Sequence, residues 1–136
     1  MTAITGQCRC GAVKFEAAEA PVAARMCWCT DCQKWSCGNA SVNAVFKKDA
    51  IAVHGETRRY ESAAASGNTM QRSFCPACGT PMFSESSGRP HLLVVRAGTL
   101  DNPSIAKPEM IIWTSSAPDW VVFDPDLPQH AKGPPA

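Results

Sequence analysis

The sequence predicts a mainly β domain made of antiparallel sheets with few short helices. Apolar and polar residues alternate at period two in several short segments, and glycine and proline mark turns between them. Many short strands between such turns are typical of a sandwich or an open, barrel-like sheet. With 136 residues, of which 45% are hydrophobic, the chain is expected to form one domain, residues 1–136, with a core.

The expected strands follow the alternation along the chain. Val13 and Phe15 alternate with charged residues, as in a half-buried strand, and residues 40–46 repeat the pattern. Two later apolar segments are expected to be buried strands, the first of them ended by Gly98. Together the expected strands lie around residues 13–16, 40–46, 51–53, 92–95 and 110–113.

Two short helices are expected. Propensity favours one over residues 61–65, ended by the turn residues 66–68, and a second is expected to start after Thr30 and Asp31, whose side chains suit an N-cap. The segment 124–136 contains four prolines and is expected to be an extended surface strap, with the core of the domain within residues 6–127.

Charge and hydropathy exclude several classes of partner. The net charge is +1 and basic residues come at most in pairs, so neither nucleic acid nor an anionic membrane is an expected partner. No segment approaches the roughly 18 consecutive apolar residues of a membrane span. The first seven residues lack the basic and apolar regions of a secretory signal, so we expect a cytoplasmic protein. The sequence does not indicate an oligomeric state.

Eight cysteines are the unusual part of the composition, and seven of them lie in tight clusters. In a reducing compartment such thiols are expected to be metal ligands or catalysts rather than disulfides. The clusters are Cys8-x-Cys10, Cys27-x-Cys29-x-x-Cys32 and Cys75-x-x-Cys78, with Cys37 alone.

The first and last pairs predict one structural zinc site. In Cys75-x-x-Cys78 one tight turn aims both sulfurs at an ion, and a strand would place the sulfurs of Cys8 and Cys10 on one face. A glycine follows each pair, as expected where the backbone needs a positive φ. Four thiolates form a closed site, which would join the start of the chain to a late hairpin and carry out no chemistry.

The middle cluster predicts a second metal site of another kind. Cys27, Cys29 and Cys32 supply three sulfurs, and zinc with three protein ligands keeps its fourth position for water or substrate. In a closed alternative Cys37 is the fourth ligand. In a third interpretation Cys32 and Cys37 form a redox pair.

Taken in order, these motifs resemble the glutathione-dependent formaldehyde-activating enzyme family, whose domain is shared with centromere protein V. The resemblance runs from about Gly6 to Leu127 and rests mainly on the seven clustered cysteines in their order and spacing. The segments that carry it are Gly6-x-Cys8-x-Cys10-Gly11-x-Val13-x-Phe15, Cys27-x-Cys29-x-x-Cys32-x-Lys34, Arg72-x-Phe74-Cys75-x-x-Cys78-Gly79, Ala97-Gly98-Thr99-Leu100-Asp101-x-Pro103 and Trp113-x-x-x-Ala117-Pro118-x-Trp120.

The resemblance implies a β-tent-like fold with two zinc ions per chain. It implies that the ligands of the structural zinc are Cys8, Cys10, Cys75 and Cys78 and that those of the catalytic zinc are Cys27, Cys29 and Cys32. The implied activity is that of a carbon–sulfur lyase similar to S-hydroxymethylglutathione synthase, with glutathione or another thiol–aldehyde adduct as substrate.

Two functions therefore remain open at this stage. The first is a zinc enzyme that acts on a thiol, with Arg72, Arg96 and Lys34 as candidate contacts to substrate carboxylates and Trp28 as a pocket wall or a core aromatic. The second is a non-catalytic, zinc-stabilised binding module for a protein partner. The three histidines, His54, His91 and His130, lie outside every cluster.

Overall fold

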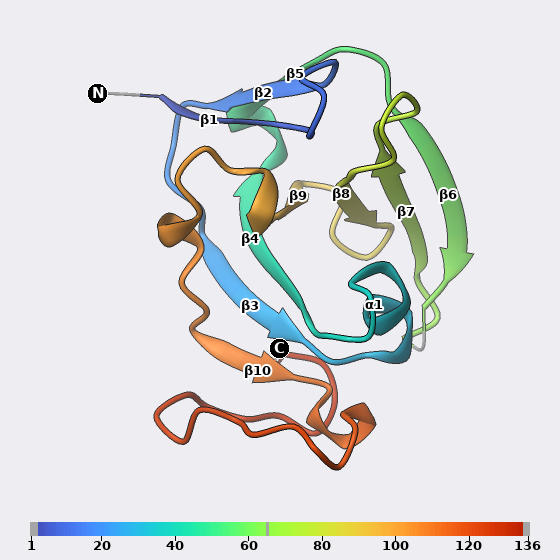
Figure 1. Cartoon of the computed structure of the whole chain (residues 1–136), viewed down its shortest axis with the longest axis vertical. Helices are drawn as coiled ribbons and strands as arrows, with labels where there is room; N and C mark the ends of the chain where they lie inside the picture. Colours follow the sequence, from blue (N-terminus) through green and yellow to red (C-terminus); the bar gives the residue numbers. More distant parts are fainter. Residues whose placement is uncertain (1–2, 65, 135–136) are drawn as a thin grey trace.

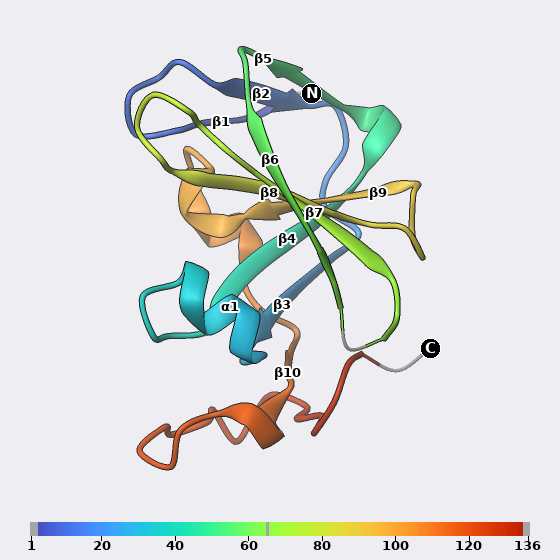
Figure 2. The ribbon, with the colours of Figure 1, turned by 90° about the vertical axis from the view of Figure 1, so that its right-hand side faces the viewer.

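The computed structural model describes residues 3–64 and 66–134, and its architecture is mainly β, as predicted. A seven-stranded sheet has the order β10-β3-β4-β9-β8-β7-β6, and a three-stranded sheet has the order β1-β2-β5 (Figures 1 and 2). The strands are β1 (Ile4–Gln7), β2 (Lys14–Ala17), β3 (Ala23–Cys27), β4 (Ser41–Lys47), β5 (Ile51–His54), β6 (Arg58–Ala63), β7 (Thr69–Phe74), β8 (Pro81–Ser86), β9 (Leu92–Arg96) and β10 (Met110–Ile112). All neighbours are antiparallel except β10 and β3, which are parallel.

The main core lies between the two sheets. Phe15 of β2 meets Phe83 of β8 edge to face, with ring centroids 5.5 Å apart, so an aromatic pair joins the sheets. Around it lie Val13, Ala17, Ala44, Phe46, Met82, Leu93, Val95 and Leu100, together with the thiols of Cys8 and Cys75. Burial of this apolar surface is the main stabilising contribution that the sheets share.

Within residues 3–64 and 66–134, helical structure is limited to the six-residue helix α1 (Thr30–Trp35) and short 3-10 turns, which confirms the expectation of few helices. The helix lies in the expected region but begins at Thr30, earlier than the expected start after Thr30 and Asp31, because its N-cap is Cys29. Among the described residues, no helix has the length and apolar character needed to cross a bilayer.

The prediction of a helix over residues 61–65 was wrong. Glu61, Ser62 and Ala63 belong to β6, and Ala65 lies outside the described residues. Six residue pairs join β6 to β7 in antiparallel register. Sheet hydrogen bonds and cross-strand contacts there outweigh the weak helix propensity of a short alanine-rich segment.

Residues 125–134 run beside β10 without a helix or strand. Ile111 donates a backbone hydrogen bond to Pro128 and accepts one from His130, both 2.9 Å long, and Trp113 donates one to Lys132. These bonds satisfy the outer edge of β10 and bring residues 133–134 to the neighbourhood of β3.

Gly6 is required where β1 crosses the core. A Cβ at this position would collide with the Phe15 ring and the Thr99 carbonyl oxygen. We expect Gly6→Ala to lower the free energy of unfolding by about 1–3 kcal/mol, the usual cost of overpacking. The matched control is Gly98→Ala, where a Cβ meets no atom within 4 Å and φ is not positive, so denaturant unfolding should show little change. Equal destabilisation by both variants would contradict this role of Gly6.

Candidate metal centres and the adjoining cavity

The four cysteines of the first and last pairs meet at one point, as predicted. Their sulfurs all lie within 4.8 Å of one another, and we call Cys8, Cys10, Cys75 and Cys78 the four-cysteine cluster. Cys75 and Cys78 lie in the turn between β7 and β8. There the backbone amide of Cys75 donates to the Thr80 carbonyl, and the Cys75 carbonyl accepts from the Gly79 amide. The backbone amide of Arg9 donates to the Thr80 hydroxyl at 3.1 Å, so a direct hydrogen bond joins the two turns.

Cys8 and Cys10 lie in a turn after β1 rather than on a strand, which corrects the expected local geometry. The amide of Gly11 donates to the Cys8 carbonyl at 3.2 Å, and Gly11 has a φ of 83°. Gly79 after the other pair has a φ of 79°, so the prediction of a positive φ at both trailing glycines is confirmed.

The spacing of the sulfurs fits tetrahedral zinc. The Cys8 and Cys10 sulfurs are 3.7 Å apart, and those of Cys10 and Cys75 are 3.8 Å apart. Zinc–sulfur bonds of about 2.3 Å at the tetrahedral angle separate two sulfurs by about 3.8 Å. Four converging thiols without other polar ligands are the donor set that structural zinc prefers, so the residues present fit this ion.

Hydrogen-bond donors favour the thiolate form of Cys78, the form that binds a metal. The pKa of Cys78 is lowered to about 5 because the hydroxyl and the amide of Thr80, and then the amide of Cys10, donate to its sulfur. Cys8 and Cys75 are 1% and 0% exposed, whereas Cys10 and Cys78 lie at the surface. The cluster therefore reaches from the core to solvent.

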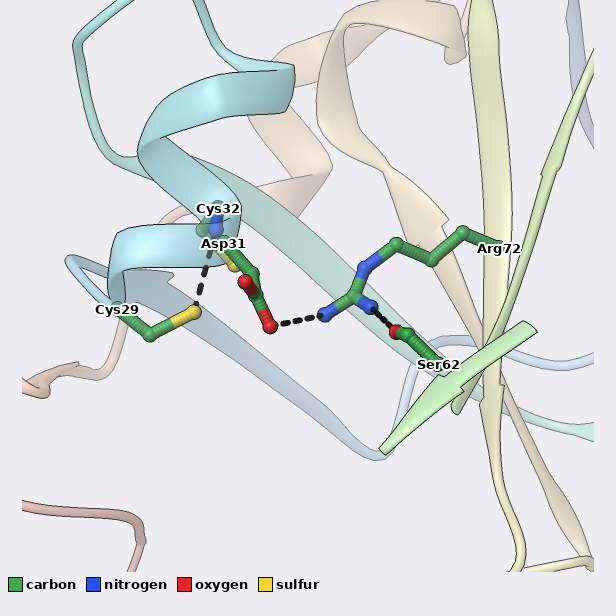
Figure 3. A network of polar contacts seen from close by, with 5 residues as sticks. All are labelled: Cys29, Asp31, Cys32, Ser62 and Arg72. Carbon is green, nitrogen blue, oxygen red and sulfur yellow. Dashed lines mark hydrogen bonds and ion pairs between the residues drawn. The ribbon is translucent and has the colours of Figure 1, made fainter. Parts of the chain in front are cut away.

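The second cluster consists of Cys27, Cys29 and Cys32, and we call it the three-cysteine cluster. Cys27 ends β3, Cys29 caps α1 and Cys32 lies in the first turn of that helix. The Cys29 sulfur accepts a hydrogen bond of 3.2 Å from the Cys32 amide, so a cysteine takes the place of a serine or aspartate cap. Figure 3 shows this contact at the start of the helix.

Gln33 fixes the turn that carries these cysteines, a role that the sequence did not indicate. Its Nε2 donates to the carbonyl oxygens of Trp28, at 2.7 Å, and Ser116, at 3.0 Å. The Trp28 amide donates to the carbonyl of Ile112 on β10. The β3–α1 turn is thus held from two sides by backbone and side-chain bonds.

Cys37 does not join the three-cysteine cluster. Within the described part of the chain, the only histidine, cysteine or acidic side chains that converge at this point are Cys27, Cys29 and Cys32. Cys37 is exposed and has a φ of 57°, and the following amide, of Gly38, donates to the Gln33 carbonyl. It occupies the left-handed position that ends helix α1, where the chain turns away from the cluster.

The three thiols share protons unequally. The pKa of Cys32 is lowered to about 2 because Cys27 and Cys29 donate hydrogen bonds to its sulfur, with further contributions from Ser41 and the charge of Arg96 that act against burial. The pKa of Cys27 is raised by its hydrogen bonds with Cys29 and Cys32 and by burial. Three sulfurs within 4.8 Å of one another fit a soft divalent ion such as zinc.

A cavity of about 470 Å³ opens beside the three-cysteine cluster, within the size range of small-ligand sites. Every strand of the seven-stranded sheet except β6 contributes to its wall, and residues 133–134 reach it as well. Among the described residues, this wall contains one carboxylate, that of Asp31, and four arginines, namely Arg25, Arg72, Arg89 and Arg96.

Arg72 connects the β6–β7 hairpin to helix α1 (Figure 3). Its guanidinium donates to the Ser62 hydroxyl at 3.1 Å, lies 4.0 Å from the Asp31 carboxylate and stacks 4.6 Å from the centre of the Trp35 ring. The Arg72 side chain is buried, so this charge is held in place by three groups. The hairpin and the helix that carries the cysteines are therefore coupled.

Arg96 lies beside the cysteines themselves. Its Nη1 donates to Asn43 Oδ1 at 2.6 Å, and Asn43 Nδ2 donates to the Ser41 hydroxyl. Burial lowers the pKa of the Arg96 guanidinium, and the negative charge of Cys32 opposes that effect. Arg96 thus supplies a fixed positive charge to the three-cysteine cluster.

The other candidates lie elsewhere. Lys34 is exposed and is not part of the cavity wall, and none of the three histidines belongs to a cysteine cluster in the described residues. Trp28 is 3% exposed and packs edge to face on Trp120, facing a different cavity of about 310 Å³. Sequence reasoning did not identify Arg25 and Arg89, because no local pattern sets them apart from surface arginines.

Comparison with known proteins agrees with the motifs. The family model described as glutathione-dependent formaldehyde-activating enzyme matches residues 3–116. A crystal structure of a Rhodobacter sphaeroides protein aligns with a TM-score of 0.59 and 22% identity, covering 76% of this chain and 96% of that one, and so shares the fold. No curated protein matches the chain.

Proposed function

Because the chain belongs to the glutathione-dependent formaldehyde-activating enzyme family, we propose that it is a zinc-dependent enzyme of the carbon–sulfur lyase type. Its substrate is a thiol–aldehyde adduct of glutathione or a similar thiol. The catalytic centre consists of Cys27, Cys29 and Cys32, and the four-cysteine cluster holds a structural zinc. The observation that carries the proposal is that all three cysteines of the three-cysteine cluster line a cavity of about 470 Å³.

The two clusters differ in the number of cysteine ligands, and we infer that this gives their zinc ions different roles. Four thiolates complete the coordination of zinc and leave it inert, whereas three leave one position exchangeable. Zinc bound by Cys27, Cys29 and Cys32 would supply that position to a thiol and favour its deprotonation. In the reaction a carbon–sulfur bond forms between the thiol sulfur and the aldehyde carbon, and the thiol proton ends on the aldehyde oxygen; the lyase direction reverses both changes.

The protein side chains hold this arrangement in place. Arg96, fixed by Asn43, offsets the negative charge of three cysteine sulfurs. Gln33 holds the β3–α1 turn, and Arg72 holds α1 against the β6–β7 hairpin. A cluster with these supports needs little rearrangement when a substrate binds, which is the condition for efficient orientation.

Exchange spectroscopy of glutathione with formaldehyde tests the proposal. We expect the zinc-loaded protein to accelerate formation and breakdown of the hydroxymethyl adduct, and Cys32→Ser to return the rate to that without protein, since one of three ligands is lost. Cys37→Ser is the matched control, an exposed cysteine outside both clusters, and should keep the full rate. Equal rates with and without wild-type protein would refute the activity toward these two substrates.

A further inference from the structure

The charges of the cavity wall are not balanced by the protein. Of its four guanidiniums, that of Arg72 lies near Asp31, and that of Arg96 faces Asn43 and the three cysteine sulfurs. Arg25 and Arg89 are the two that remain, and Asp31, the only carboxylate of the wall in the part of the chain that the structure describes, already lies near Arg72. An excess of positive charge in a partly enclosed space attracts an anionic ligand.

Arg25 has the more constrained position of the two. It lies on β3 two residues before Cys27, and side chains two apart on a strand point to the same face, so both contribute to the cavity wall. Its Nε is buried and has no hydrogen-bond partner. A buried donor without a partner is costly to maintain in the protein alone, which is the condition a bound acceptor would relieve.

Arg89 adds a second positive charge at the rim. It is exposed in the connection between β8 and β9, where its amide donates to the Ser86 carbonyl. The positive charge of Arg89 contributes to lowering the pKa of Arg25. The carboxylate of Glu109 acts in the opposite direction on the pKa of Arg25. Glu109 lies outside the cavity wall, and its carboxylate accepts a hydrogen bond from the Ala24 amide. The two like charges therefore meet at the cavity with no carboxylate of the wall between them.

We propose that Arg25 and Arg89 form an acid-group subsite, which binds a carboxylate or phosphate of the thiol whose sulfur lies at Cys27, Cys29 and Cys32. This rests on the proposed function and adds to it the part of the substrate that is recognised. Guanidinium groups bind carboxylate and phosphate oxygens with paired, charge-assisted hydrogen bonds.

The separation of the subsite from the cysteines sets the size of the thiol. Two residues along a strand span about 7 Å, so the acid group lies several bonds from the sulfur. A thiol of peptide or pantetheine size with a terminal acid fits this spacing, whereas a thiol of two or three carbons does not reach. Selection among thiols would then depend on the acid group as well as on the sulfur.

Calorimetric titration of the zinc-loaded protein tests the subsite without reliance on turnover. The probes are glutathione and its diethyl ester, and phosphopantetheine and pantetheine, which separate a carboxylate from a phosphate as the recognised group. We expect at least one acid-bearing probe to bind about tenfold more tightly than its neutral counterpart, as for a charged hydrogen bond. Equal affinity within both pairs, or no binding of either acid, would overturn the proposal.

Substitutions assign the effect to these two residues. Arg25→Gln and Arg89→Gln should each weaken the preferred acid about tenfold and leave its neutral counterpart unchanged, while Arg89→Lys should restore part of the affinity. Arg58→Gln, an exposed arginine on β6 outside the cavity wall, is the matched control. Since Arg89 is exposed, its variants keep the test valid if Arg25→Gln fails to fold.

The outcomes separate the subsite from the proposed function. Arginine-dependent binding of an acid without any lyase activity would support the subsite and refute the activity. Lyase activity with acid binding that is unchanged in both arginine variants would support the activity and overturn the subsite.

Discussion

Replacing Cys78 with serine is expected to leave the protein insoluble or sensitive to protease, whereas Cys29→Ser is expected to stay folded and to lose one zinc. In the four-cysteine cluster Cys10 and Cys75 are 65 residues apart, so one ion there closes about half of the chain into a loop and offsets much chain entropy. Binding of a structural zinc is worth about as much free energy as the net stability of a whole domain. The soluble fraction, limited proteolysis and zinc content of both variants check this.

The positions of the two cysteines make the comparison clean. Cys78 is exposed, so serine there creates no cavity or buried polar group, and a loss of fold would come from the missing ligand. At Cys29 serine is itself a good N-cap, so helix α1 keeps its first hydrogen bond. A soluble Cys78→Ser protein with fully cooperative unfolding would contradict this division of labour, and Cys37→Ser should behave as wild type throughout.

The second large effect is a difference in how fast the two metals leave. We expect mild chelation to remove one zinc per chain quickly, with the β-type circular dichroism unchanged, and the other only as the protein unfolds. Cys27, Cys29 and Cys32 lie within six residues, adjoin the cavity and offer a chelator an exchangeable position, and losing their ion opens almost no loop. Colorimetric zinc release recorded alongside circular dichroism measures both steps.

Ligand protection and one variant sharpen this result. Excess glutathione should slow the first step, because it competes with the chelator for the exchangeable position. Cys37→Ala should release zinc as the wild type does, since Cys37 lies outside the cluster. If both ions leave together, or if Cys37→Ala alone makes the first one labile, the three-cysteine site is closed, and a binding module explains the protein better than an enzyme.

Five of the ten strands, β2, β4, β5, β9 and β10, were predicted, because their apolar pattern was clear, whereas β1, β3, β6, β7 and β8 were not predicted as strands. Residues 40–46 show this pattern and form most of β4, an inner strand of the seven-stranded sheet that lies between β3 and β9. β7 was missed because its polar residues do not alternate with large apolar ones: its Arg72 is buried by pairing with Asp31 and Trp35 rather than by hydrophobicity. β6 also lacks a clear alternation of apolar and polar residues, and part of it was therefore predicted to be a helix.

The candidate site divides along similar lines. Cysteine spacing predicted both clusters, because a metal ligand set is encoded by residue type and local distance. Arg25 and Arg89 could not be found this way, since only the order of the sheet brings a residue on β3 and a residue after β8 to one cavity. The question of Cys37 also needed the structure, which shows that α1 ends on a left-handed residue and carries this thiol away.

The positions of the two clusters along the chain give each a different time of completion during synthesis. All three sulfurs of the cluster beside α1 are available once residue 32 has left the ribosome, whereas the four-cysteine cluster must wait for residue 78. Until then Cys8 and Cys10 are unpartnered thiols on a nascent chain, and β1 has no late hairpin to dock against. Such a distant pairing is a slow step of folding, so the supply of metal and reductant at that moment decides how much of the newly made protein reaches its native state.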